Sequence, residues 1–172
     1  MAHDEISQPS KHLPATSLRI AGVVKESVVD GPGLRYVIFT QGCNLKCPGC
    51  HNLHTWDPQG GYLVEFATLL QSIAEVKLLD GITLSGGEPF LQAAACADLI
   101  TLIRQRFPSL NILVYSGYYH HQLLELAKLD KEINRLLALA DILVDGPFDA
   151  QQKNPTLPFR GSANQQMIVL SK

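Results

Sequence analysis

The sequence predicts an α/β fold built on an open, mostly parallel β-sheet. Short runs rich in β-branched and aromatic residues alternate with segments whose apolar residues recur at helical spacing. Such alternation is typical of βαβ units, which place their strands side by side in one parallel sheet. The chain has 172 residues, 46% hydrophobic and 17% charged, which suits one domain with a core over residues 18–172. A full set of barrel units does not fit in this length, so the sheet is expected to stay open.

The first part of the chain is predicted to contain a leader, two strands and a helix. Residues 1–17 are polar and lack the apolar stretch of a secretory signal, so we expect a flexible leader on a cytoplasmic protein. LRIAGVV (18–24) and RYVIFT (35–40) have the composition of strands, and the turn-rich VDGPG (29–33) lies between them. Apolar residues at helical spacing predict a helix over 65–77.

The second part alternates more regularly. The expected strands are GITLS (81–85), NILVYS (111–116), ILVDG (142–146) and QMIVLS (166–171), and the expected helices are 91–107, 120–128 and 131–140. Sites in parallel sheets lie at the carboxyl ends of the strands. The cysteine-rich segment after 35–40 and the GGEP after 81–85 are therefore expected to share one site.

Three of the four cysteines fall in QGCNLKCPGCHN (41–52), where Cys43, Cys47 and Cys50 form C-x3-C-x2-C. Three thiolates on one short loop can hold three irons of a [4Fe–4S] cube, so the fourth iron stays open to a substrate. Gly49 lets the backbone approach the sulfides closely. Structural disulfides are not expected in a reducing compartment.

Three other chemistries fit parts of this segment. A c-type haem site would use Cys47, Cys50 and His51, but it leaves Cys43 unexplained and requires export. A redox dithiol of Cys47 and Cys50 should open a helix, and HNLHTWDPQGG is a poor helix start. Zinc held by the three cysteines and His54 is chemically sensible, whereas His51 adjoins Cys50 too closely to share its metal. The cluster explains all three thiols, and metal analysis distinguishes it from zinc.

C-x3-C-x2-C after an early strand, with GGEP about 36 residues beyond the last cysteine, resembles the radical S-adenosylmethionine (SAM) enzymes. The resemblance implies an open partial (β/α) barrel with one [4Fe–4S] cluster on Cys43, Cys47 and Cys50. In that family the open iron chelates the amino and carboxylate groups of SAM. One electron then cleaves SAM to methionine and a 5′-deoxyadenosyl radical, which takes a hydrogen atom from the substrate. No catalytic residue is expected beyond the cluster and SAM.

The same resemblance implies where SAM binds. The backbone of the last cysteine turn lies against SAM, the paired glycines leave room for its methionine part, and Glu88 offers an acceptor to its ammonium. GGEP alone would also fit a tight strand-to-helix turn, with proline at a first helical position. The expected SAM-binding residues are Gly49, Cys50, His51, Gly86, Gly87, Glu88 and Ser116.

Other motifs resemble the activases of glycyl-radical enzymes, namely VDGPG and the CHN that Thr55 and Trp56 follow. Within that group, PGC (48–50), YSGY (115–118) and the ending LVDGPFDAQQKNPTLPFRGSANQ (143–165) resemble the activators of anaerobic ribonucleotide reductase. Formate-lyase activases usually have an aromatic residue before the last cysteine. His51 departs from the pattern, because some of the reductase activators carry tyrosine there.

The resemblance implies the partners as well. The target is the anaerobic ribonucleotide reductase, and the electron comes from a flavodoxin or ferredoxin because the chain has no second redox centre. A net charge of −2 without a Lys/Arg run gives no reason to expect a nucleic acid or an anionic membrane. One alternative is a formate-lyase-type activase. Another is a small-molecule enzyme such as 7-carboxy-7-deazaguanine synthase, which is expected to lack the DGPG and RGS-x-NQ motifs.

For some residues the sequence leaves two roles open. Asp145 either faces the radical site or caps a loop. Arg160 and Asn164 either dock a glycine loop or a carboxylate, or belong to a surface loop. Cys96 is expected in the core, and Trp56 is expected to pack against the cluster loop and shield it from water.

Overall fold

A seven-stranded sheet organises residues 15–170, the part of the chain that the computed structural model describes. Its order is β3-β1-β2-β4-β5-β6-β7. The central strands β2, β4, β5 and β6 run parallel, and β1, β3 and β7 join antiparallel. The predicted α/β class with an open, mostly parallel sheet is confirmed. The strands are β1 (Ser17–Ser27), β2 (Arg35–Thr40), β3 (Tyr62–Glu65), β4 (Gly81–Gly86), β5 (Asn111–Tyr115), β6 (Ile142–Asp145) and β7 (Gln166–Val169).

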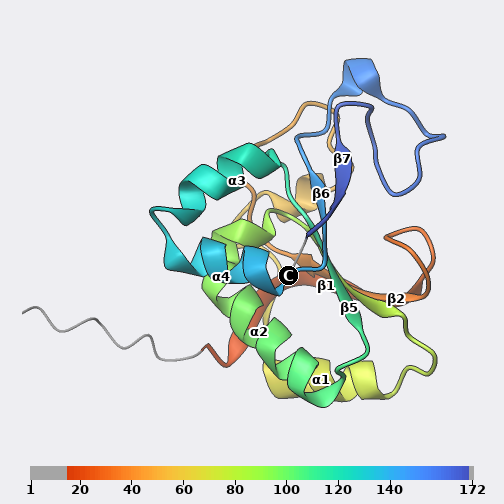
Figure 1. Ribbon diagram of the computed structural model, residues 1–172, viewed down its shortest axis with the longest axis vertical. Coiled ribbons are helices and arrows are strands. Elements are labelled where there is room, and N and C mark those ends of the chain that lie inside the picture. The colour runs from red at the N-terminus through yellow and green to blue at the C-terminus, as the bar shows by residue number, and fades with distance from the viewer. Residues whose placement is uncertain (1–14, 171–172) are drawn as a thin grey trace, which may run out of the picture.

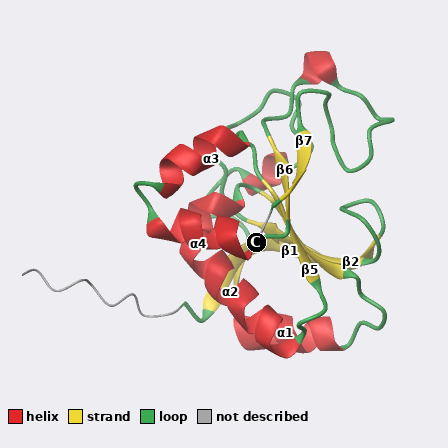
Figure 2. Ribbon diagram, in the orientation of Figure 1, coloured by secondary structure: helices red, strands yellow, loops and turns green. Residues whose placement is uncertain are grey.

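Helices α1 (Phe66–Ala74), α2 (Ala93–Arg106), α3 (His120–Ala127) and α4 (Lys131–Leu139) lie to one side of the sheet (Figure 1, Figure 2). The core lies between helices and sheet, where alternate strand residues meet the apolar helix faces. Three short 3₁₀ turns complete the described elements: Leu53–Thr55, Pro89–Gln92 and Ala150–Gln152. No helix of residues 15–170 is long and apolar enough to span a bilayer.

The pairing of the first two strands was not predicted, and the structure differs from the expected elements in two other places. β1 pairs antiparallel with β2, because the loop 28–34 is too short for the crossover that a parallel pair requires. β3 was not expected, since three of its four residues are exposed and show no strand pattern. The helix predicted from 91 begins as a 3₁₀ turn, and α2 starts at Ala93.

The predicted leader lies mostly outside the described residues, which begin at Ala15. Its last residues are bonded to the domain. The Ala15 N–H donates to the Asp98 carboxylate (2.8 Å), and the Thr16 carbonyl accepts from the Phe66 N–H (2.8 Å).

Arg35 fixes the VDGPG loop on the face of the sheet opposite the helices. Its guanidinium is fully buried and donates to Ile82 O (2.6 Å), Thr83 Oγ1 (3.0 Å) and Pro32 O (3.3 Å). The Thr83 hydroxyl in turn donates to Asp30 O (2.9 Å). Burial lowers the pKa of Arg35, as expected for a charge removed from water. The loop 28–34 is thereby bonded to β4 through one buried side chain.

Candidate active site

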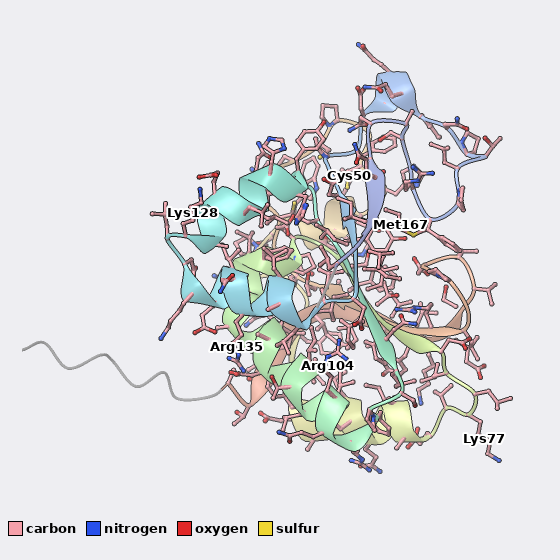
Figure 3. The ribbon with its side chains drawn as sticks, in the orientation of Figure 1. Cys50, Lys77, Arg104, Lys128, Arg135 and Met167 are labelled. Carbon is pink, nitrogen blue, oxygen red and sulfur yellow. The ribbon has the colours of Figure 1, made fainter. Side chains whose placement is uncertain are left out.

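A cavity of about 690 Å³ opens at the carboxyl ends of the four parallel strands. The cysteine segment follows β2, the GGEP segment follows β4, Ser116 and Gly117 follow β5, and Gly146 follows β6. Figure 3 shows Cys50 in this region, between α3 and the segment after β6. All the residues predicted to bind the cluster or SAM line the cavity except Gly49.

Backbone hydrogen bonds hold the stem of the cysteine loop. The N–H groups of Gly42 and Cys43 donate to Thr55 O (2.7 Å) and Trp56 O (3.1 Å). The buried Gln41 side chain donates to the carbonyls of His54 (3.0 Å) and Asp57 (2.7 Å). The segment after the last cysteine therefore folds back on the residues before the first, which closes the loop into a compact unit.

The three thiols of this loop are free and partly exposed, and all three line the cavity. Left-handed backbone at Lys46 (φ 47°) and Gly49 (φ 78°) gives the loop its tight turns. The Asn52 N–H points at Cys50 Sγ (3.4 Å). Burial raises the pKa of the Cys43 thiol, and the N–H groups of Leu45 and Lys46 oppose that shift. Donors of this kind stabilise sulfur that carries negative charge.

This donor set fits an iron–sulfur cube. In such a cube each of the three cysteine thiolates binds a different iron, so the three sulfur atoms do not need to converge on one point. Within residues 15–170, no three His, Cys, Asp or Glu side chains converge as ligands of one metal ion would.

Glycine is required at both positions of the GGEP turn. A Cβ on Gly87 would lie 2.3 Å from Gly42 O, and one on Gly86, which has φ 94°, would lie 2.7 Å from Phe39 Cα. The turn is bonded to the cysteine loop by Gly87 N–H to Thr40 O (2.8 Å) and by the next N–H to Gly42 O (2.8 Å). These two hydrogen bonds join the GGEP turn to the end of β2 and the start of the cysteine loop.

Glu88 is fully buried and joins the GGEP turn to the end of β5. Its carboxylate accepts from the Gly117 N–H (2.8 Å), the Ser116 hydroxyl (3.1 Å) and the Phe90 N–H (3.1 Å). Burial raises the pKa of Glu88 to about 7 against the effect of these donors. A carboxylate has about four acceptor positions, so one stays open for the predicted ammonium contact. The link to β5 was not predicted, because GGEP alone does not show which distant residues it meets.

Ser116 also has a local role. Its hydroxyl oxygen accepts from the Tyr118 N–H (3.1 Å) while its proton faces Glu88. A Cβ on Gly117 would lie 2.3 Å from Leu45 Cδ1, so glycine lets the cysteine loop pack closely here. The YSGY motif is thus the contact between the end of β5 and the loop that carries the thiols.

The segment after β6 covers the cysteine loop from the other side. The Phe148 ring packs edge-on against His51, with centroids 5.8 Å apart, and stands between Gly49 and Gly161. Phe148 belongs to the LVDGPF motif of the sequence, but its packing against the cysteine loop was not predicted, because the motif alone does not show which distant residues the ring meets. Asp145 accepts from the N–H groups of His120 (2.7 Å) and Gln166 (3.1 Å), which supports its capping role.

Two further expectations concern residues next to the site. Cys96 is fully buried on α2, as expected for a core residue, and its thiol lies 3.6 Å from Pro89 O. Trp56 is partly buried beside Cys43, and its indole N–H is buried without an acceptor in the described part of the chain.

Comparison with known proteins agrees with this site. Residues 29–168 match the sequence model of a protein family described as the 4Fe-4S single cluster domain. The anaerobic ribonucleoside-triphosphate reductase-activating protein of Haemophilus influenzae is 34% identical over 144 residues, covering 80% of this chain and 89% of that protein. The Vibrio cholerae protein of the same name is 37% identical over 144 residues, with the same coverage. The Escherichia coli K12 protein is 34% identical over 145 residues, covering 80% and 90%.

Among solved structures, QueE from Escherichia coli is 18% identical with a TM-score of 0.45, over 60% of this chain and 54% of that one. This likeness is too distant to bear on the fold or the function.

Proposed function

The chain belongs to the family of anaerobic ribonucleoside-triphosphate reductase-activating proteins, radical SAM enzymes that carry a 4Fe-4S domain, and we propose how its residues perform that activity. In this proposal Cys43, Cys47 and Cys50 hold one [4Fe–4S] cluster and SAM binds beside it in the cavity. The single observation that carries the proposal is that these three thiols and the GGEP turn line one cavity.

When bound and reduced, the cluster supplies the electron that cleaves SAM and so starts hydrogen abstraction from a glycine of the reductase. The residues of the chain then serve to position SAM beside the cluster. Gly86 and Gly87 leave space for the methionine part of SAM beside the cysteine loop, and the backbone at Cys50 and His51 forms the adjoining wall. Glu88 accepts from the Ser116 hydroxyl and the Gly117 N–H, which holds the turn after β4 against the turn after β5.

The electron donor we propose is a flavodoxin or ferredoxin in the cytoplasm, because the cavity offers one set of cluster ligands. Neither a nucleic acid nor a membrane belongs to the proposal, since the chain has a net charge of −2 and no basic run.

Replacement of each cysteine tests the ligand assignment. Cys43→Ala, Cys47→Ala and Cys50→Ala should each lose the cluster's iron and sulfide and stop release of 5′-deoxyadenosine from SAM. Cys96→Ala is the matched control, because this thiol is buried on α2 and does not line the cavity. Iron, sulfide and 5′-deoxyadenosine are measured in protein prepared without oxygen. Full SAM cleavage by Cys43→Ala would show that the three-thiolate assignment is wrong, and zinc without iron in the wild type would exclude the cluster.

A further inference from the structure

The segment RGSANQ (160–165) forms part of the outer wall of the cavity. Side chains of Ser162, Asn164 and Gln165 bond backbone groups, which closes a turn within the segment and fastens it to the end of β6. Their bonds are Asp149 N–H to Ser162 Oγ (3.1 Å), Asn164 Nδ2 to Pro147 O (2.8 Å), Gly161 N–H to Gln165 Oε1 (2.8 Å) and Gln165 Nε2 to Gly146 O (2.9 Å).

Two buried polar atoms of this segment, Arg160 Nε and Asn164 Oδ1, have no hydrogen-bond partner among residues 15–170, and Arg160 is the charged residue of the two. It lines the cavity, and its one hydrogen bond in the described part of the chain runs from Nη1 to Gln165 O (3.3 Å). Its Nε is buried and has no acceptor among residues 15–170. Its guanidinium also forms no ion pair there. A guanidinium carries five N–H donors, so most of its binding capacity is unused.

The backbone before Arg160 has an unusual conformation. Phe159 is left-handed (φ 58°), which is costly for a residue with a side chain. The Tyr115 hydroxyl at the end of β5 donates to Phe159 O (2.8 Å) and holds that conformation. Burial raises the pKa of Tyr115, so this donor stays protonated. Arg160 is therefore presented on a fixed backbone.

Lys153 is a second cation that lines the cavity and has no ion pair among the described residues. Two acids line the cavity as well. Asp30 accepts from the Ser27 hydroxyl (2.6 Å) and Glu88 accepts from the Gly117 N–H (2.8 Å), and neither acid forms an ion pair with Arg160 or Lys153. Across the cavity, Val28 and Val29 on the loop 28–34 are 69% and 73% exposed. Figure 1 shows this orange loop and the blue segment 153–161 on the side of the sheet away from the helices.

We propose that Arg160 binds a carboxylate side chain of the substrate protein, close to the glycine that loses hydrogen. This inference rests on the proposed function. A planar guanidinium matches a carboxylate through two parallel hydrogen bonds, which fix orientation as well as position. Within the proposed function the carboxylate of SAM is bound at the open iron, so the free carboxylate comes from the substrate protein. Arg160 is then a specificity-determining residue that aligns an acidic peptide segment.

The test compares Arg160→Gln with Lys77→Gln in the cluster-loaded protein. Lys77 is exposed at the opposite end of the molecule from Cys50 and its replacement removes the same charge (Figure 3). Glycyl radical on the anaerobic reductase is followed by electron paramagnetic resonance at several reductase concentrations. Arg160→Gln should raise the half-saturating reductase concentration roughly 10- to 100-fold, the loss expected for a charge-assisted bond. Lys77→Gln should match the wild type.

Two further readouts separate binding from a structural role. The dissociation constant for SAM should change less than about twofold, and the rate at saturating reductase should stay near that of the wild type. Added salt should reduce the difference in half-saturating reductase concentration between the wild type and Arg160→Gln, because salt screens the attraction between Arg160 and the carboxylate. Arg160→Lys keeps the positive charge but loses the planar guanidinium. Its half-saturating reductase concentration should lie between those of the wild type and Arg160→Gln. If Arg160→Gln fails to fold, the comparison of Arg160→Lys with the wild type tests the inference.

An unchanged half-saturating concentration in both Arg160 variants would overturn the inference. A weakened SAM affinity in the absence of reductase would overturn it as well, since it would assign Arg160 to SAM. A wild-type protein that forms no glycyl radical on the reductase would contradict the proposed function itself.

Discussion

Gly87→Ala tests whether the contact between the GGEP turn and the cysteine loop controls the site. The new Cβ would lie 2.3 Å from Gly42 O, 2.9 Å from Gly42 C and 3.1 Å from Thr40 O. All three are backbone atoms, so no side chain can turn away and the two segments must separate by about 1 Å to reach van der Waals contact. That shift breaks the hydrogen bonds of Gly87 N–H and Glu88 N–H, both 2.8 Å.

Two lost hydrogen bonds cost about 2 kcal/mol, and the overpacking adds about 1–3 kcal/mol. For a domain of this size, a total near 4 kcal/mol lowers the unfolding temperature by about 8–16 °C. The affinity for SAM should also fall, because the displaced turn is a proposed wall of its site.

The matched control is Gly22→Ala in β1, where an added Cβ meets nothing within 4 Å. Thermal unfolding and SAM binding are measured for both variants against the wild type. Gly22→Ala should change the unfolding temperature by no more than a few degrees. The reasoning would be refuted by a Gly87→Ala protein that matches Gly22→Ala in unfolding temperature and in SAM affinity.

Three other changes have defined outcomes. Arg35→Met removes the buried guanidinium that donates to Ile82 O, Thr83 Oγ1 and Pro32 O, so denaturant unfolding should show a loss of about 2–5 kcal/mol, and a loss below about 1 kcal/mol would be inconsistent with this role. Because burial raises the pKa of Glu88 from 4.5 to about 7, the protonated carboxyl adds stability below pH 4.5 that is lost as the pH rises through about 7. The free energy of unfolding should therefore fall by roughly 3 kcal/mol across that window in the wild type and not in Glu88→Gln, measured by urea titration at each pH. Tyr115→Phe removes the donor to Phe159 O, so limited proteolysis should cut segment 153–161 faster than in the wild type, and an unchanged rate would show that the bond does not hold the segment.

The sheet could be predicted because its central strands are apolar runs that alternate with helical patterns. Tyr36, Ile38, Ile82 and Ile112 are buried, as such runs imply. β3 could not be predicted, since its short exposed stretch is a strand only because the edge of β1 is beside it. The mostly parallel sheet that was predicted left the pairing of the first two strands unassigned, although the short loop 28–34 between them favours an antiparallel pair.

The cysteine loop and GGEP were predictable as one site because spacing and position after a strand are properties of the sequence. The roles of individual polar side chains were not, because they depend on contacts between residues distant in the chain. Glu88 meets Ser116 and Gly117 across 28 and 29 positions, and Arg35 meets Asn111 across 76. A charged residue at the start of a strand also gives no indication that it is fully buried, as Arg35 is.

The most direct test of the account labels the hydrogen atom that is transferred. Anaerobic reductase made with glycine deuterated at Cα is mixed with the reduced, cluster-loaded chain and SAM, and formate lyase labelled in the same way is tested in parallel. The account predicts deuterium in 5′-deoxyadenosine and a glycyl radical whose paramagnetic resonance doublet collapses on deuteration, in the reductase sample alone. The same result with formate lyase alone would keep the chemistry and overturn the partner. Unlabelled 5′-deoxyadenosine without a glycyl radical in either sample would contradict the claim that this chain is a glycyl-radical activase.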